Sequence, residues 1–150
     1  MSRRVATAPF AALVREFELE LIHLRQMIAL AEEESRNLVG GEVERIDAIA
    51  AEKLAQLHAL ELYSRRRADC LARQGFSADA SGLAACARAA GPRGRALTAV
   101  WKQVADALAT LRDLNEENAM LLRARLAAID LPDPASPPRT ARARAASPPE

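Results

Sequence analysis

Apolar residues recur at alternating steps of four and three residues along two long stretches of this 150-residue chain. The first stretch runs from Phe10 to Leu38, and the second runs from Leu97 to Ile129. This spacing places the apolar side chains on one stripe of an α-helix and is typical of long helices that pack along one another. Additional apolar residues widen the first stripe, so the first helix needs more than one neighbour and should lie at the centre of a bundle.

Glycines and capping residues divide the chain into helical segments. The pattern predicts long helices over residues 9–38, 42–74 and 96–129, and a possible short helix over residues 80–90. Gly40 and Gly41 allow a tight reversal, so the first two helices should be antiparallel neighbours. We therefore expect an all-α fold, in which a long antiparallel helical hairpin and a third long helix form a three-helix bundle of coiled-coil type.

The connector before the third helix is the least determined part of the chain. Residues 77–95 offer Ser and Asp caps and an alanine-rich run that is broken by Gly91 and Pro92. Such a segment predicts a weakly anchored helix. A flexible connector would let the third helix lie on the hairpin or move away from it.

The second helix has an apolar stripe and a basic end. The residues expected to face inward are Val43, Ile46, Ile49, Ala50, Leu54, Leu57, Leu60, Ala68 and Leu71. The last turns contain four arginines, namely Arg65, Arg66, Arg67 and Arg73. Positive charge favours the C-terminal end of a helix, and a nucleic-acid site would want more basic residues and exposed aromatic residues nearby. We therefore interpret the arginines as a solvated helix terminus, which Gly75 ends.

Both ends of the chain lack a helical pattern. Residues 1–8 show no periodicity, and six of the eight prolines fall within residues 131–150, among Ala, Ser and Arg. A segment of this composition cannot bury a core. We expect one helical domain over residues 9–130, between a disordered N-terminus at residues 1–8 and a disordered tail at residues 131–150.

Composition argues against several classes of protein. The formal net charge is only +1 although 27% of residues are charged, which favours a solvated helical surface over a nucleic-acid partner. No apolar run approaches the roughly 18–20 residues that span a bilayer, and no signal peptide follows Met1. Cys70 and Cys86 lack metal-ligand spacing and are too few for a disulfide scaffold. These features predict a cytoplasmic protein with reduced thiols and no membrane insertion.

Candidate catalytic and metal-binding residues are sparse. Glu20 and His23 form half of the paired motif of carboxylate-bridged di-iron bundles, but Ala55 stands where His58 would need a glutamate. The segment from Gly91 to Gly94 follows no strand and is not a phosphate-binding loop. We therefore expect no enzyme activity, no catalytic residue, no metal site and no cofactor.

Two asparagines interrupt the apolar stripe of the last helix. Asn115 and Asn118 occupy positions where leucine would be expected, and an amide there must find a hydrogen-bond partner. They could fix the register inside the protein's own bundle, as single buried asparagines do in coiled coils. Alternatively, they could bind the polar groups of an incoming helix. The residues alone leave both interpretations open.

The order of these segments is characteristic. A helix rich in Leu and Glu is followed by Glu52-Lys53-Leu54, Leu57, Leu60-Glu61, the arginines and Gly75-Phe76. A helix containing Trp101 comes last and carries Leu114-Asn115-Glu116-Glu117-Asn118, with Leu121-Leu122 after it. In this order and spacing the chain resembles the FlgN-type flagellar export chaperones over roughly residues 12–126.

The resemblance implies a cytoplasmic chaperone of flagellar type III export. Such chaperones bind the C-terminal helical regions of the first and third hook-associated proteins, which are the hook–filament junction subunits. They prevent premature self-association of these subunits and deliver them to the export gate. The family places cargo contacts mainly on the C-terminal helix, which implies a cargo-binding set here of Leu111, Leu114, Asn115, Asn118, Leu121 and Leu122.

A structural role is the alternative. The regular spacing of the first and third helices would also suit a coiled-coil module that self-associates and carries no export cargo. The two hypotheses differ in the oligomeric state and the cargo affinity that they predict.

Overall fold

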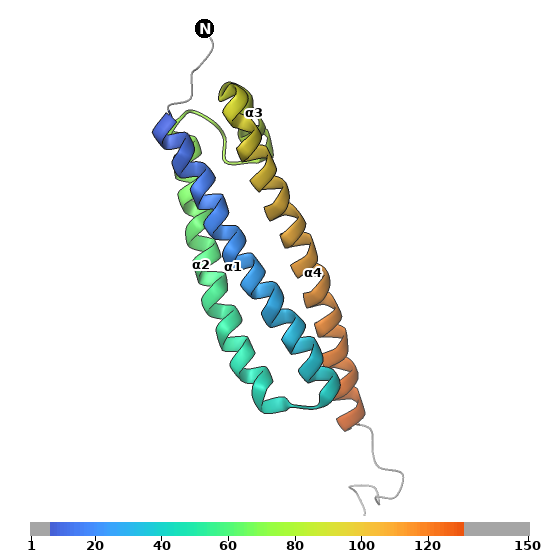
Figure 1. The fold of residues 1–150 in the computed structure, drawn as a ribbon. Helices are drawn as coiled ribbons and strands as arrows, with labels where there is room; N and C mark the ends of the chain where they lie inside the picture. Colours follow the sequence, from blue (N-terminus) through green and yellow to red (C-terminus); the bar gives the residue numbers. More distant parts are fainter. Residues whose placement is uncertain (1–6, 131–150) are drawn as a thin grey trace, which may run out of the picture.

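The computed structural model describes residues 7–130 and shows a slender bundle of helices (Figure 1). In chain order the elements are α1 (Thr7–Gly40), α2 (Val43–Arg73), α3 (Ala80–Ala89), the short 3₁₀ helix η1 (Gly91–Arg93) and α4 (Gly94–Asp130). Within residues 7–130 no strand occurs. This confirms the all-α fold of a long hairpin with a third long helix. The predictions of disorder over residues 1–6 and 131–150 lie outside the described residues, and residues 7 and 8 belong to α1.

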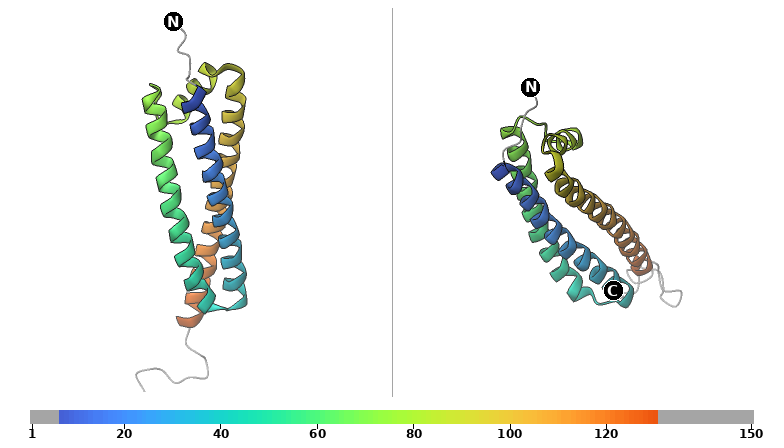
Figure 2. Two further views of the ribbon diagram at one scale, coloured as in Figure 1. Left: turned by 60° about the vertical axis from the view of Figure 1, so that its left-hand side comes forward. Right: turned by 45° about the horizontal axis from the view of Figure 1, so that its top comes forward.

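Helix α1 lies at the centre of the bundle, as its wide apolar stripe predicted. It packs along α2 on one side and along α4 on the other, whereas no Cα atom of α2 lies within 8 Å of one of α4. Figure 1 shows α1 between the other two long helices, and in the left view of Figure 2 α4 crosses behind α1. The core consequently forms along α1, with its largest fully buried side chains being Leu13, Phe17, Leu24, Ile49, Leu71, Cys86, Leu97 and Val104.

Helix α2 buries less of its apolar stripe than the sequence predicted. Ile49 and Leu71 are buried, but the side chains of Leu54 and Leu57 are 53% and 43% exposed. The prediction that both leucines face inward is wrong. Because no Cα atom of α2 lies within 8 Å of α4, the second flank of α2 remains uncovered by α4.

Glycines end both helices of the hairpin. Gly41 has a φ of 85°, and its N–H and that of Glu42 both donate to the carbonyl of Asn37. At the end of α2, Gly75 has a φ of 81° and its N–H donates to Ala72 O, while the N–H of Phe76 donates to the carbonyl of Leu71. This pair of bonds is a Schellman motif, which satisfies the last carbonyls of the helix.

The connector is more firmly packed than expected. The carboxylate of Asp79 caps α3 by accepting a hydrogen bond of 2.7 Å from the N–H of Gly82. Leu83 and Cys86 of α3 are buried in the core. The prediction of a weakly anchored helix is therefore wrong, since α3 packs against the start of α4 and holds this end of the bundle together.

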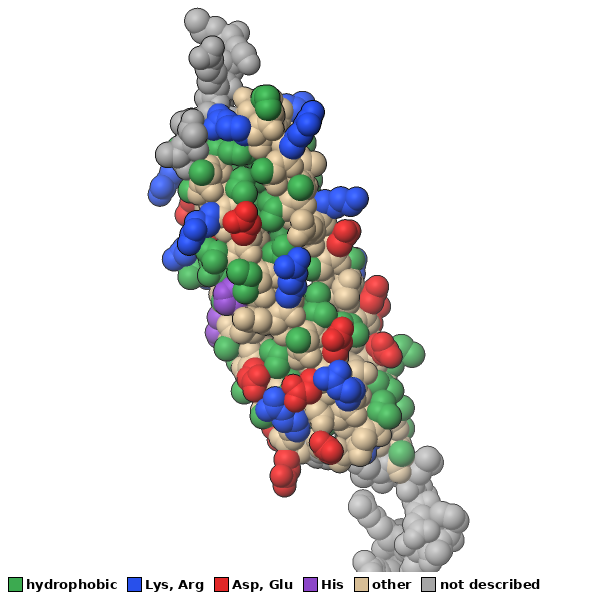
Figure 3. All heavy atoms as spheres, viewed as in Figure 1, with side chains coloured by type: hydrophobic (Ala, Val, Ile, Leu, Met, Phe, Trp, Pro, Cys, Tyr) green, Lys and Arg blue, Asp and Glu red, His purple; other side chains and the backbone are tan. Residues whose placement is uncertain are grey.

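The surface carries both signs of charge. Figure 3 shows one face, on which basic and acidic side chains are scattered among apolar ones, with the acidic side chains mainly in the lower half. None of the described helices is long and apolar enough to cross a membrane.

Candidate protein-binding groove

A long groove lies between α2 and α4, with α1 as its floor. It follows from the packing, because both outer helices contact α1 but diverge from each other. The volume is about 650 Å³. We define the α2–α4 groove by its lining residues, which are Glu20 and Met27 of α1, Ala50, Lys53, Leu54, Leu57, Leu60, Glu61, Ser64 and Arg67 of α2, and Leu108, Leu111 and Asn115 of α4.

The walls of the α2–α4 groove are apolar and open to solvent. Leu54 and Leu57 of α2 face Leu108 of α4, whose side chain is 43% exposed. Covering the exposed half of each leucine is worth about 1 kcal/mol, since full burial from water is worth about 1.5–3 kcal/mol. Three such leucines in one groove form a surface that a partner helix could cover with a large gain.

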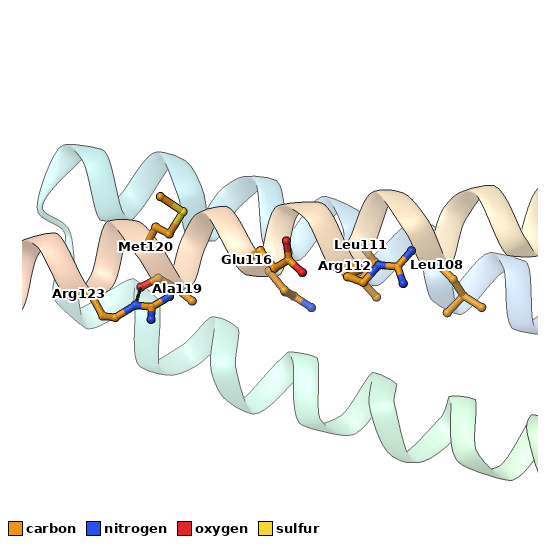
Figure 4. Close-up of a pocket in the computed structure, with 8 residues that line it drawn as sticks. Leu108, Leu111, Arg112, Glu116, Ala119, Met120 and Arg123 are labelled. Atoms are coloured by element: carbon orange, nitrogen blue, oxygen red, sulfur yellow. Dashed lines mark hydrogen bonds between the residues drawn. The ribbon is translucent and has the colours of Figure 1, made fainter.

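A second hollow continues the groove along the C-terminal half of α4. It shares Leu108, Leu111 and Asn115 with the α2–α4 groove and has a volume of about 690 Å³. Figure 4 shows its lining side chains along one face of α4, with Met120 and Arg123 at its far end. The apolar surface therefore runs on beyond the part that α2 faces.

Lys53 joins the two walls across the α2–α4 groove. Its Nζ donates to Asn115 Oδ1 at 2.8 Å and lies 3.2 Å from Glu34 Oε2 of α1. The amide of Asn115 is thus half-buried at the groove and bonded to α2. One ammonium group connects all three long helices at this point.

Asn118 faces α1 rather than the groove. Its side chain is only 2% exposed, and its Nδ2 donates to Ala31 O at 2.8 Å. Its Oδ1 has no hydrogen-bond partner among the described residues. This contact matches the alternative in which an asparagine fixes the register of the protein's own bundle.

The six candidate cargo-binding residues therefore occupy different environments. Leu111 is buried but reaches the α2–α4 groove, and Leu114 packs partly buried against the core. Asn115 lies in the groove, while Asn118 is turned away from it. Leu121 is half-buried, and Leu122 is exposed. The structure brings Leu111 and Asn115 together in the groove, with the others distributed around α4.

A buried ion pair lies at the other end of the groove, and sequence reasoning missed it. Arg67 Nη1 is 3.1 Å from Glu20 Oε2, and the guanidinium stacks over Phe17 at 4.5 Å from the ring centroid. Glu20 is 4% exposed. Its position three residues after Phe17, on the apolar stripe of α1, was a sequence signal that it needed a buried partner.

Burial dominates the electrostatics of this pair. Desolvation raises the pKa of Glu20, and the charge of Arg67 opposes the rise. Desolvation also lowers the pKa of Arg67, against the influence of Glu20. Glu20 Oε2 has the contact with Arg67 Nη1, whereas Arg67 Nε has no hydrogen-bond partner among the described residues. The interpretation of Arg67 as part of a solvated terminus is wrong, whereas Arg65 and Arg66 are exposed.

The histidines have ordinary structural surroundings. His23 Nδ1 bonds to Gln56 Oε1 of α2, and its ring lies 5.3 Å from that of Tyr63. His58 is exposed. Residues 7–130 contain no group of three His, Cys, Asp or Glu side chains that could hold a metal ion.

Long amphipathic helices that leave an apolar groove between them define a helical bundle protein suited to binding other helices. The family described as FlgN protein matches residues 9–131, and the chain belongs to this family. The crystal structure of a flagella synthesis protein FlgN from Pseudomonas aeruginosa, at 1.48 Å resolution, is similar. It shares 27% identity and a TM-score of 0.68, covering 74% of this chain and 86% of that one. No curated protein matches the chain. Together these findings support a general role as a flagellar export chaperone.

Proposed function

We propose that this protein binds the C-terminal helical regions of the first and third hook-associated proteins in the cytoplasm. It keeps these hook–filament junction subunits from premature self-association and delivers them to the flagellar export gate. The observation that carries the proposal is the apolar surface of α4 and its groove, which stays exposed in a member of the FlgN family.

The mechanism needs no nucleotide and no covalent chemistry. A free junction subunit exposes an amphipathic segment that can associate with other copies. Laying that segment against the apolar face of α4 removes both surfaces from water, which stabilises the monomeric cargo by mass action. The cargo segment loses conformational freedom on binding, so affinity stays moderate and release at the gate remains feasible.

The proposed cargo surface of α4 comprises Leu111, Leu114, Asn115, Asn118, Leu121 and Leu122. Leu122 and Asn115 are its accessible part, since the first is exposed and the second lies in the groove. Leu111, Leu114 and Asn118 pack toward α1 and support this surface from beneath. Their substitution would act through the position of α4 as well as through contact.

Co-purification tests the proposal directly. The full chain is co-expressed with the C-terminal region of each junction subunit, and the complex is isolated through a tag on the cargo. Leu122→Arg is expected to reduce recovery strongly, because it puts a charge on the proposed surface. Leu62→Arg is a matched control, since both leucines are 44% exposed but Leu62 lies on α2 outside the groove. Failure of the unsubstituted chain to retain either cargo contradicts the proposal.

Self-association is the second candidate function. Leu122 and Leu126 leave exposed apolar side chains one turn apart on the same face of the last turns of α4, which a second copy could also cover. Sedimentation of the free chain distinguishes the two functions. A stable dimer without cargo affinity favours the coiled-coil module, and a monomer that binds cargo favours the chaperone.

A further inference from the structure

The α2–α4 groove has the dimensions and lining of a site for one more helix. Its α2 wall extends over Ala50–Arg67, which at 1.5 Å per residue is about 25 Å, or close to five helical turns. The floor and both walls are helices, so no strand edge is available for an extended segment among residues 7–130. An occupant must satisfy its own backbone groups in an apolar groove, which a helix does internally.

The polar groups of the groove narrow the chemistry of that helix. The apolar wall residues Leu54, Leu57 and Leu108 require an apolar stripe opposite them. At one end, however, the groove is lined by the ion pair of Glu20 on the floor and Arg67 on the α2 wall. Both side chains line the groove but are almost covered, with 6% of the Glu20 side chain and 14% of the Arg67 side chain still exposed. An occupant that covered this pair with hydrocarbon alone would remove the remaining access to water and leave both groups unsatisfied.

We propose that the α2–α4 groove binds the cargo as a fourth helix, whose apolar stripe carries one Asn or Gln side chain set over Glu20 and Arg67. An amide offers an N–H donor to the carboxylate and a carbonyl acceptor to the guanidinium. The bound helix packs on α1, α2 and α4 and completes a four-helix bundle. Specificity comes from the amide, since a stripe of leucines alone leaves the ion pair unsatisfied. This inference rests on the proposed function. It extends the proposed cargo-binding surface from α4 to the α2 wall of the groove, which includes Leu54 and Leu57.

Thiol protection tests which chain occupies the groove. Leu57→Cys places a thiol in the groove wall, and Leu62→Cys places a thiol of matched exposure outside the groove. The unsubstituted chain gives the background from Cys70 and Cys86. We expect the thiol at position 57 to react freely in the free protein and to be protected at least tenfold by the C-terminal segment of the first or third hook-associated protein. The thiol at position 62 should be unaffected.

Four results of this experiment overturn the proposal. Protection of position 57 in the free chain that increases with protein concentration identifies a second copy as the occupant. Protection that does not depend on concentration and is lost on removal of residues 131–150 identifies the tail. Cargo that binds without protecting position 57 excludes the groove but leaves the proposed function intact, whereas cargo segments that do not bind at all overturn both.

A specificity exchange tests the amide. Each Asn or Gln in the apolar stripe of the cargo segment is replaced in turn by Leu. One replacement should weaken binding to the unsubstituted chain roughly tenfold, as expected for an unmade hydrogen bond to a buried charge. The same replacement should strengthen binding to the double variant Glu20→Leu with Arg67→Met, whose fold is checked by circular dichroism. If every replacement changes the affinity for both proteins by the same factor, the ion pair does not contribute to cargo specificity.

Discussion

Replacement of Asn118 by leucine should stabilise the free protein, although it removes a buried hydrogen bond. Leucine has the same branched outline as asparagine, so the side chain fits the space between α4 and α1. The bond from Nδ2 to Ala31 O is worth about 1 kcal/mol net. Against it, the variant removes a buried Oδ1 that has no partner among residues 7–130, at a gain of about 1–3 kcal/mol. It also adds buried hydrocarbon worth about 1.5–3 kcal/mol at most.

The balance is a gain in the free energy of unfolding of about 2 kcal/mol. For a chain of 150 residues this raises the melting temperature by about 4–8 °C, which calorimetry or thermal circular dichroism measures. Asn115→Leu is the control, because that side chain is half-buried and its partner Lys53 keeps Glu34. It should change stability by less than about 1 kcal/mol. A fall of several degrees for Asn118→Leu refutes the reasoning and shows that the amide bond outweighs the orphan oxygen.

Three further predictions concern buried charge and close packing. Burial raises the pKa of Glu20 above its ordinary 4.5, so the free energy of unfolding falls as pH rises from 4.5 through the raised pKa. Urea titrations from below pH 4.5 to neutrality should show a smaller fall for Glu20→Gln, which has no carboxyl group to ionise. Arg67→Met leaves Glu20 buried without a counter-charge and should lower the free energy of unfolding, measured in urea, by about 3 kcal/mol. Adding Glu20→Leu to the same chain should restore much of that loss, and a double variant that shows no recovery contradicts the prediction. Gly82→Ala should lower the free energy of unfolding by at least about 2 kcal/mol, since the added Cβ would lie 1.7 Å from Ser77 O. Gly40→Ala is the control, because a Cβ there meets nothing within 4 Å. Equal melting temperatures for the two variants would exclude the clash.

The long helices could be predicted from the sequence because their signals are local. The alternation of four and three residues along 10–38 and 97–129 marks a helical stripe, and glycines mark the ends. Gly41 and Gly75 do adopt the positive φ that these helix ends require. The central position of α1 also followed, because a stripe wider than one contact face needs two neighbours.

The groove could not be predicted, because it depends on which helices do not pack together. Leu54 and Leu57 have the spacing of core residues, and only the divergence of α2 from α4 leaves them exposed. The two asparagines were equally ambiguous. Two side chains that lie three residues apart on a helix point about 60° away from each other. This difference is enough to place Asn118 against α1 and Asn115 in the groove.

The ion pair escaped prediction for a similar reason. Glu20 and Arg67 lie on different helices, and only the register of the hairpin brings them within 3.1 Å. A row of arginines at a helix end normally remains in water, so the sequence favoured that interpretation for Arg67. The glutamate on the apolar stripe was the clue that a partner existed, without saying which residue it was.

The two bonds of Lys53 make its contact across the α2–α4 groove easy to exchange. Its ammonium contacts Asn115 on α4 and Glu34 on α1 at the same time. When Asn115 turns toward another partner, the ammonium keeps its carboxylate and is never left as an isolated charge. Breaking the contact with Asn115 exchanges one hydrogen bond and leaves the ion pair with Glu34 in place. The Asn115 amide can therefore exchange this hydrogen bond for one to a partner while Lys53 still joins α2 to α1 through Glu34.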